Sequence, residues 1–236
     1  MTESVVGGST AAGPAAGPAA GPASGAADAA APTGGPVLPV IRRVRAEEWA
    51  AVRDVRLEML RDPAAAMAFL DTYANAAAQP DTFWQGRTTA AAAAQTVVQY
   101  VAEVPGDGAG GPLDGRSGPS EDTGASAVPG RWVGSVTGLL EQPGAQDFEG
   151  RPVEMLQVHV VGVWLHPDHR GQGVVQRMID AVVAWGVERG VERARLYVHA
   201  DNGRAQGAYR KAGFAPSGRE LIASTGRELE MVRALH

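Results

Sequence analysis

A strand, a glycine turn and a helix follow one another in the second half of the chain, and this arrangement constrains the fold most. The apolar run at residues 156–165 predicts a buried strand, and residues 174–187 predict an amphipathic helix. Between them stands Arg-Gly-Gln-Gly at residues 170–173. A turn through glycines into a helix presents backbone N–H groups at the positive end of the helix dipole, and the arginine adds a cation. The junction therefore predicts an anion site, and in a biological ligand the anion is usually phosphate.

The composition divides the chain into a tail and one domain. Residues 1–36 are an Ala/Gly/Pro repeat with almost no larger apolar side chain, which predicts a disordered tail. Residues 37–236 are long enough for a single domain. Within them, residues 105–130 are rich in Gly, Pro, Ser and Asp, and strand-like sequence resumes directly afterwards. We therefore expect a flexible insertion there rather than a domain boundary.

Charge, cysteine content and hydropathy exclude several classes of protein. The net charge is −5 and no basic block is present, which disfavours nucleic-acid binding. No run of about 18 apolar residues occurs, so we expect no membrane span. The sequence has no cysteine, which removes disulfides and thiolate metal sites and fits a cytoplasmic protein.

The periodicity of apolar residues predicts strands and then alternating strands and helices. Strands are expected at residues 37–44, 97–104, 132–140, 156–165, 193–199, from 214 onward, and 227–235. Helices are expected at residues 46–60, 64–70, 82–92, 174–187 and 202–212. This order predicts a mixed α/β sheet with local parallel pairs.

Two familiar nucleotide-binding loops do not match the glycine turn. A dinucleotide-binding fingerprint needs a third glycine where Gln176 stands, and it belongs near the first strand of a domain. A Walker A loop needs a Gly-Lys-Ser/Thr ending that is absent. A different phosphate-binding family is needed to explain the turn.

Two segments together resemble the GNAT family of N-acetyltransferases. They read HPDHRGQGVVQRMID and, about thirty residues later, DNGRAQGAYRKAGF. In that family an R/Q-x-x-G-x-G/A loop binds the pyrophosphate of acetyl-coenzyme A, and Arg170 and Gly173 match it. The last position of the loop is Val175, where the family has a small residue. The resemblance is strong over residues 156–214 and weaker over 37–140.

The resemblance implies a fold and a set of contacts. The fold is a mixed, mostly antiparallel central sheet flanked by helices, in which a splayed parallel strand pair holds the cofactor. The residues implied to contact acetyl-coenzyme A are Val163, Trp164, Leu165, Arg170, Gly171, Gln172, Gly173, Val174, Val175, Gln176, Asn202, Ala205 and Tyr209.

The second segment also has a local interpretation. Asp201 or Asn202 can cap the helix that follows, and Gly213 can end it. In relatives the matching Asn contacts the pantetheine region and the matching Tyr lies near the sulfur. A phenol is protonated at neutral pH, so Tyr209 can donate a proton to the departing thiolate. The alternative is a tyrosine that packs in the core behind Phe214.

The central strand is expected to carry the acyl site. By resemblance, a bulge separates it from the next strand and exposes a backbone N–H that can polarise the thioester carbonyl. Gly162 is the predicted bulge position, because an isolated glycine in a strand often marks one.

Two residues are candidates for the general base. His159 stands where many relatives carry Glu, and histidine can accept a proton near neutral pH. Glu154, at the start of the same strand, is the second candidate. Either side chain can instead have a structural role. His166, Asp168 and His169 resemble a metal cluster, but they lie on the turn before the glycines, and we expect no metal.

These observations predict an N-acetyltransferase that moves an acetyl group from acetyl-CoA to a primary amine by direct attack in a ternary complex. The acceptor is a small molecule or a protein amine, and a homodimer is an expectation because dimers are common among relatives. Two alternatives stay open: a non-catalytic module that senses acyl-CoA, and a nucleotide-binding interaction domain.

Overall fold

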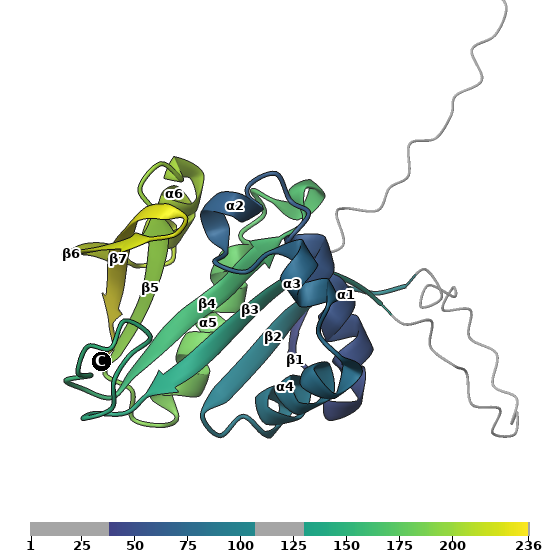
Figure 1. Ribbon diagram of the computed structural model, residues 1–236, viewed down its shortest axis with the longest axis horizontal. Coiled ribbons are helices and arrows are strands. Elements are labelled where there is room, and N and C mark those ends of the chain that lie inside the picture. Colours follow the sequence, from purple (N-terminus) through teal and green to yellow (C-terminus); the bar gives the residue numbers. More distant parts are fainter. Residues whose placement is uncertain (1–37, 107–129, 236) are drawn as a thin grey trace, which may run out of the picture. The chain divides into compact units, whose positions relative to one another are not determined.

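The computed structural model describes residues 38–106 and 130–235. The tail predicted at 1–36 and most of the insertion predicted at 105–130 lie outside these residues. The described part forms an α/β domain, shown as a ribbon in Figure 1.

A mixed sheet runs through the domain. Its order is β1-β2-β3-β4-β5-β7-β6, and all neighbours are antiparallel except β4 and β5. The strands are β1 (Val40–Arg43), β2 (Val97–Val104), β3 (Arg131–Glu141), β4 (Gln157–Leu165), β5 (Arg193–His199), β6 (Ala215–Ala223) and β7 (Gly226–Ala234). The predicted mixed, mostly antiparallel sheet is confirmed.

Helices cover both faces of this sheet. They are α1 (Trp49–Met59), α2 (Ala65–Ala68), α3 (Tyr73–Ala77), α4 (Asp81–Ala93), α5 (Val174–Val187) and α6 (Gly203–Lys211), with short 3-10 turns η1 (Ala46–Glu48) and η3 (Pro167–His169). The sequence did not predict α3, because a single capped turn is too short to show helical periodicity.

Alternation along β2 separates two hydrophobic cores. Val98 and Ala102 point to the face covered by α5, whereas Val101 points to the opposite face and joins the cluster under α1 and α4. α5 lies behind the sheet in Figure 1, and α1, α3 and α4 lie in front of it. Each face of the central strands is therefore packed, and only a local irregularity can open a binding site there.

That irregularity is a bulge in β4 at Gly162. Val161 pairs with Thr137 and Trp164 pairs with Ser135, so two β4 residues stand opposite one β3 residue. Gly162 has φ +61°, a left-handed conformation that favours glycine. The bulge predicted at this position is confirmed.

The parallel pairing of β4 with β5 ends before the bulge. It covers only three pairs and stops where His159 faces Arg195. The rest of β5 continues to pair with β7 on its other side. The two central strands therefore separate at their carboxyl ends, as expected for a splayed pair.

We expect Gly138→Ala to destabilise the domain and Gly86→Ala to stabilise it. A Cβ at Gly138 would lie 2.5 Å from a methyl group of Val182 on α5, so it would overpack the core and cost about 1 to 3 kcal/mol. Gly86 lies within α4 with nothing near its added Cβ, so alanine there should add about 0.5 to 1 kcal/mol. Urea unfolding measures both effects, and equal shifts in the same direction would contradict this packing.

Candidate functional site

The site begins at the glycine turn before α5. Gly171 and Gly173 have φ values of +80° and +75°, and Gly173 is the N-cap of the helix. The first bond within this helix is donated by Arg177 to the carbonyl of Gly173, and no side chain caps the start. The N–H groups of the first helical turn therefore have no intrahelical acceptor and can bind an anion.

Arg170, just before the turn, is held by an aspartate from a distant part of the chain. Its Nη2 donates to Asp62 Oδ2 at 2.5 Å, and its Nε donates to the carbonyl of Leu165 at 2.9 Å. Trp164 Nε1 donates to the same Asp62 oxygen at 3.1 Å. Burial favours the neutral acid, but hydrogen bonds from the backbone of Ala64, from Trp164 and from Arg170 lower the pKa of Asp62. Arg170 is thus fixed in orientation by an ionised carboxylate.

Helix α6 brings the second sequence segment to the same place. Asn202 Oδ1 accepts a hydrogen bond from the N–H of Ala205 at 3.1 Å, so the predicted cap is present. Gly213, with φ +85°, follows the helix and allows Phe214 N–H to donate to the carbonyl of Tyr209. Both predicted ends of α6 are confirmed.

Tyr209 is a buried phenol on α6. Burial, with a smaller contribution from the charge of Glu228, raises the pKa of Tyr209 to about 12. No hydrogen bond between the Tyr209 phenol and another described residue contributes to this rise in pKa. Its ring also packs near Phe214, at 6.5 Å between centroids, so the predicted core contact and exposure to the cavity coexist.

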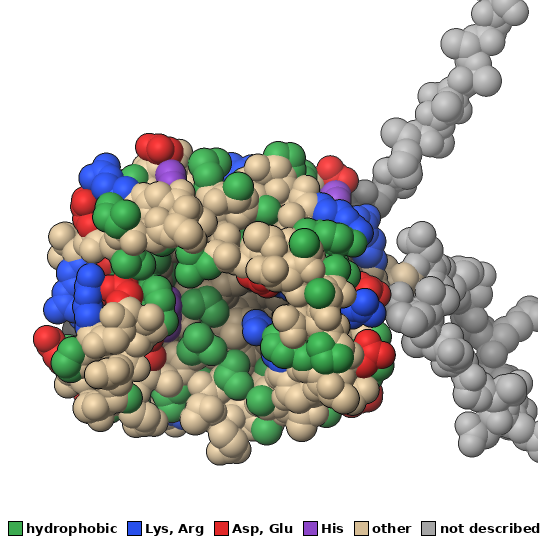
Figure 2. Space-filling view, in the orientation of Figure 1, with side chains coloured by type: hydrophobic (Ala, Val, Ile, Leu, Met, Phe, Trp, Pro, Cys, Tyr) green, Lys and Arg blue, Asp and Glu red, His purple; other side chains and the backbone are tan. Residues whose placement is uncertain are grey.

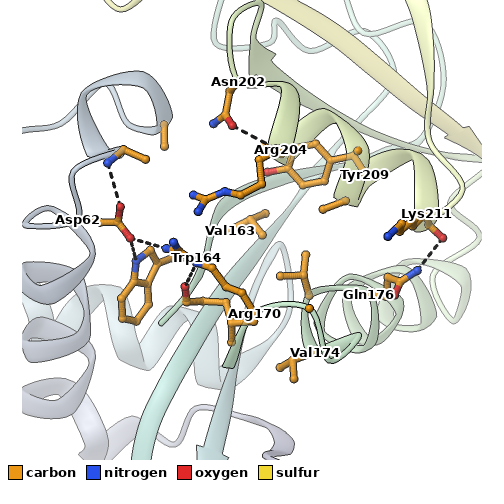
Figure 3. A pocket seen from close by; sticks show the side chains of 18 of the residues that line it. Asp62, Val163, Trp164, Arg170, Val174, Gln176, Asn202, Arg204, Tyr209 and Lys211 are labelled. Carbon is orange, nitrogen blue, oxygen red and sulfur yellow. Dashed lines mark hydrogen bonds and ion pairs between the residues drawn. The ribbon is translucent and has the colours of Figure 1, made fainter. Parts of the chain in front are cut away.

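These elements enclose a cavity of about 530 Å³. Its walls come from the end of β4, the glycine turn and start of α5, helix α6, and the segment around α2 (Figure 3). The lining residues are Asp62, Ala64, Ala65, Ala68, Phe69, Val163, Trp164, Leu165, Arg170, Gly171, Gly173, Val174, Val175, Gln176, Asn202, Gly203, Arg204, Ala205, Gly207, Ala208, Tyr209 and Lys211. Every residue predicted to contact the acyl donor lines this cavity except Gln172, whose amide reaches only the Asp168 carbonyl at 3.5 Å.

Comparison with known proteins identifies this part of the chain. The sequence profile described as "Acetyltransferase (GNAT) family" matches residues 126–214. These residues contain the bulged strand, the glycine turn and α6. Residues 126–214 are therefore similar to the GNAT family.

Part of the chain is also similar to a curated protein. The chain is 38% identical over 90 residues to mycothiol acetyltransferase from Saccharomonospora viridis, and the match covers 38% of this chain and 28% of that protein. The chain thus spans only about a quarter of the length of that relative.

Solved structures share the fold. An acetyltransferase of the GNAT family from Streptococcus pneumoniae has a TM-score of 0.57 at 13% identity, over 84% of this chain and 99% of that one. The PaiA N-acetyltransferase from Thermoplasma acidophilum, solved with coenzyme A, has a TM-score of 0.55 at 12% identity, over 83% and 98%. At such identities the likeness shows the GNAT fold alone.

The cavity also contains two cations that were not predicted from the sequence as cofactor-binding residues. Arg204 lies in the first turn of α6 and Lys211 lies at its end. A cation in the first turn of a helix is opposed by the helix dipole. The position of Arg204 in the sequence is therefore unfavourable unless an anion lies near it, and this was the signal that could have marked it.

The wall around α2 was the other part that sequence analysis did not assign to the acyl-donor site. Asp62 and Phe69 come from the region between α1 and α3, and both line the cavity. Phe69 also lies under the guanidinium of Arg56, at 4.8 Å from the ring centroid. No local motif marks these residues, because their role depends on helices packing onto the far end of β4.

Neither candidate base lines this cavity. His159 is buried with Nδ1 3.4 Å from Glu141 Oε1, and its ring stacks on Phe148 at 5.2 Å between centroids. Glu154 is exposed and lies 3.8 Å from Arg219. His159 precedes the bulge, in the part of β4 still paired with β5, and this position keeps it from the cavity.

His159 instead belongs to a buried charge network around Arg195. The guanidinium of Arg195 donates to both oxygens of Glu141, at 2.7 and 2.8 Å, and also to Asp147 and Glu230. Burial raises the pKa of Glu141, but hydrogen bonds from His159 and Arg195 outweigh it and lower that pKa to about 2. The network therefore depends on an ionised Glu141.

Residues 38–106 and 130–235 contain neither a metal-binding cluster nor a helix that could span a membrane. No group of three or more His, Cys, Asp or Glu side chains there could hold a metal ion, including the His166 turn. None of the helices in this described part is long and apolar enough to cross a membrane.

We expect Glu141→Gln to lower the free energy of unfolding by about 3 kcal/mol at pH 7. The pKa of Glu141 in the folded protein, about 2, lies below the usual glutamate value of 4.5. The carboxylate therefore stabilises the fold above pH 4.5, and this contribution is lost as the pH falls from 4.5 towards 2. Unfolding of both proteins at several pH values measures the difference, which should shrink in acid.

Glu220→Gln is the matched control, because Glu220 forms an exposed pair with Arg227 and should contribute less than about 1 kcal/mol. A Glu141→Gln effect as small as the control's, or one that grows in acid, would contradict the assignment.

Proposed function

We propose that this GNAT domain transfers the acetyl group of acetyl-CoA to a primary amine. The observation that carries the proposal is one cavity that joins the anion-binding turn of α5 to the phenol of Tyr209 beside the bulge in β4. Its volume, about 530 Å³, lies in the range of pockets that bury small organic ligands.

The polar groups of the cavity suit the phosphate end of coenzyme A. The free N–H groups at the start of α5 would bind pyrophosphate, with positive charge from Arg204 and Lys211. Arg170 would take part while it remains anchored on Asp62. The charge of Asp62 offsets that of Arg170, so Arg204 and Lys211 carry the excess positive charge.

The acyl end would lie where β4 and β5 separate. Val163 follows the bulge and lines the cavity, so its backbone is the proposed contact for the thioester carbonyl. Asn202 caps α6 through its oxygen, which leaves its amide NH₂ available to the pantetheine arm. Figure 3 shows Val163 between Tyr209 on α6 and the Asp62–Trp164–Arg170 group.

The proposed reaction is direct attack. The amine nitrogen bonds to the thioester carbon, the carbon–sulfur bond breaks, and Tyr209 protonates the departing thiolate. The raised pKa of Tyr209, about 12, keeps the phenol protonated at neutral pH. Because neither His159 nor Glu154 lines the cavity, we propose that the acceptor reacts as the neutral amine and that its proton passes to water. The chain has no cysteine that could form an acyl-enzyme.

The acceptor, the cellular location and the oligomeric state of the protein are predictions from the sequence. The acceptor is proposed to be an amine of a small molecule or of a protein. Cytoplasmic location and a homodimer also stay predictions.

Calorimetry with coenzyme A and with ATP tests the ligand. We expect coenzyme A to bind and ATP to bind at least tenfold more weakly, because ATP has no pantetheine arm to fill the space beside β4. Preference for ATP would instead support a nucleotide-binding domain.

A pair of variants makes this test specific to the turn. Arg170→Gln leaves the buried Asp62 carboxylate, whose side chain is 6% exposed, unpaired beside the anion site. It should weaken binding of coenzyme A more than the double variant with Asp62→Asn does. Equal affinity for coenzyme A in the unaltered protein, the single variant and the double variant would contradict phosphate binding at this turn.

Tyr209→Phe tests the chemistry. We expect kcat to fall by about a hundredfold, because proton donation to the thiolate is lost, while the affinity for coenzyme A changes less than threefold. Release of free thiol with an amine panel measures kcat, and calorimetry measures affinity. Unchanged kcat refutes the acid role. Tight binding of acetyl-CoA with no thiol release by the unaltered protein favours a sensor module.

A further inference from the structure

A second cavity, of about 230 Å³, lies among α1, α3 and α4 on the sheet face opposite α5. Its lining residues are Arg56, Asp71, Ala76, Gln79, Phe83, Trp84 and Arg87. Figure 2 shows the molecule from the side on which α1, α3 and α4 lie in Figure 1. The mechanism proposed above uses none of these side chains.

The charges in this second cavity do not balance. Arg56 and Arg87 contribute two positive charges and Asp71 contributes one negative charge. Asp71 is paired with Arg56, whose Nη2 donates to Asp71 Oδ2 at 3.2 Å. Arg87 forms no hydrogen bond or ion pair within the described residues. One guanidinium is therefore left with all its donors available.

Arg87 lines the cavity and is also exposed to solvent. Desolvation by the cavity walls lowers the pKa of Arg87, the nearby charge of Arg56 lowers it further, and Asp71 opposes this shift. Arginine stays charged in proteins, so an anion that enters the cavity can pair with the guanidinium of Arg87. Such a site is suited to the two oxygens of a carboxylate or a phosphate.

The wall of the cavity also contains a buried indole. Trp84 is 2% exposed, and its indole Nε1 has no acceptor among the described residues. A buried N–H without a partner is unfavourable. The amide of Gln79 adds another polar group to the wall. The cavity therefore combines the guanidinium of Arg87 with the amide of Gln79, and the buried indole of Trp84 lies in its wall.

Phe69 lies between this second cavity and the cavity of the proposed reaction, which is called the reaction cavity below. Its ring lines the reaction cavity, and on it lies the guanidinium of Arg56, which lines the second one. One aromatic side chain thus lies between the site proposed for the acetyl group and the basic site. A molecule that extends from one cavity to the other needs an amine at one end and an anionic group at the other.

We infer that the amine acceptor carries an anionic oxygen group, a carboxylate or a phosphate, that is bound by Arg87 with help from Arg56. This inference rests on the proposed acetyltransferase function and names the class of its acceptor. Arg87 determines specificity in this proposal, and Arg56 is held in position by Asp71 and Phe69.

Matched acceptor pairs test the inference through free-thiol release. The pairs are n-butylamine with 4-aminobutyrate, n-hexylamine with 6-aminohexanoate, and ethanolamine with O-phosphoethanolamine. We expect kcat/KM to be about ten to a hundred times higher for at least one acidic member, as for a charge-assisted hydrogen bond. The first two pairs report on a carboxylate and the third on a phosphate.

Arg87→Gln should abolish this preference by lowering kcat/KM for the acidic amines to that of their uncharged partners. Arg87→Lys should keep part of it, because the charge remains without the planar donor pair. Arg45→Gln is the matched control, because Arg45 is exposed and pairs weakly with Glu48 outside both cavities. No preference in the unaltered protein, or a preference that survives Arg87→Gln, overturns the inference and leaves the acetyltransferase function standing.

A second measurement does not depend on turnover. The indole N–H resonance of Trp84, assigned with Trp84→Phe, should shift on titration with inorganic phosphate or succinate, and Arg87→Gln should remove the shift. This result supports the anion site even if no amine releases thiol, in which case the proposed function fails. Absence of a shift in the unaltered protein overturns the site.

Discussion

The binding site depends on the end of the parallel pairing between β4 and β5. These strands stay together for three residue pairs, and β4 then bulges at Gly162. Without the separation, the sheet would continue with packed helices on both faces and no opening between its central strands. The glycine is required because the bulge needs a left-handed residue, which a side chain with a Cβ disfavours.

Helices from both ends of the chain complete the site around this opening. α5 and α6 meet on one side, where Gln176 Nε2 donates to the carbonyl of Lys211 at 2.9 Å. The segment near α2 closes the other side through the Asp62–Arg170 ion pair. Since Asp62 also accepts from Trp164, a single carboxylate orients the arginine before the glycine turn and fixes the end of β4. The preorganised cation and free N–H groups are what the proposed phosphate binding needs.

Much of this site could be predicted because its signals are local. Gly162, the capping Asn202 and the terminating Gly213 each act through backbone geometry within a few residues, so sequence patterns identify them. His159 was different. It was predicted as a candidate general base, but its side chain lies beside Glu141, which pairs with Arg195, and does not line the cavity. His159 precedes the bulge, and a sequence pattern does not show which ion pairs the neighbouring strands β3 and β5 supply.

By itself, the sequence determined the order of strands and helices, the glycine turn, the bulge and the resemblance to a GNAT domain. Short-range hydrophobic periodicity and glycine conformation encode these features. Only the tertiary structure decided that Arg170 pairs with Asp62, 108 residues away, and that Arg56 and Arg87 share a cavity. These residues become neighbours only when separate helices pack against the same sheet. Because they are far apart in the sequence, no periodic pattern of residues predicts their contact.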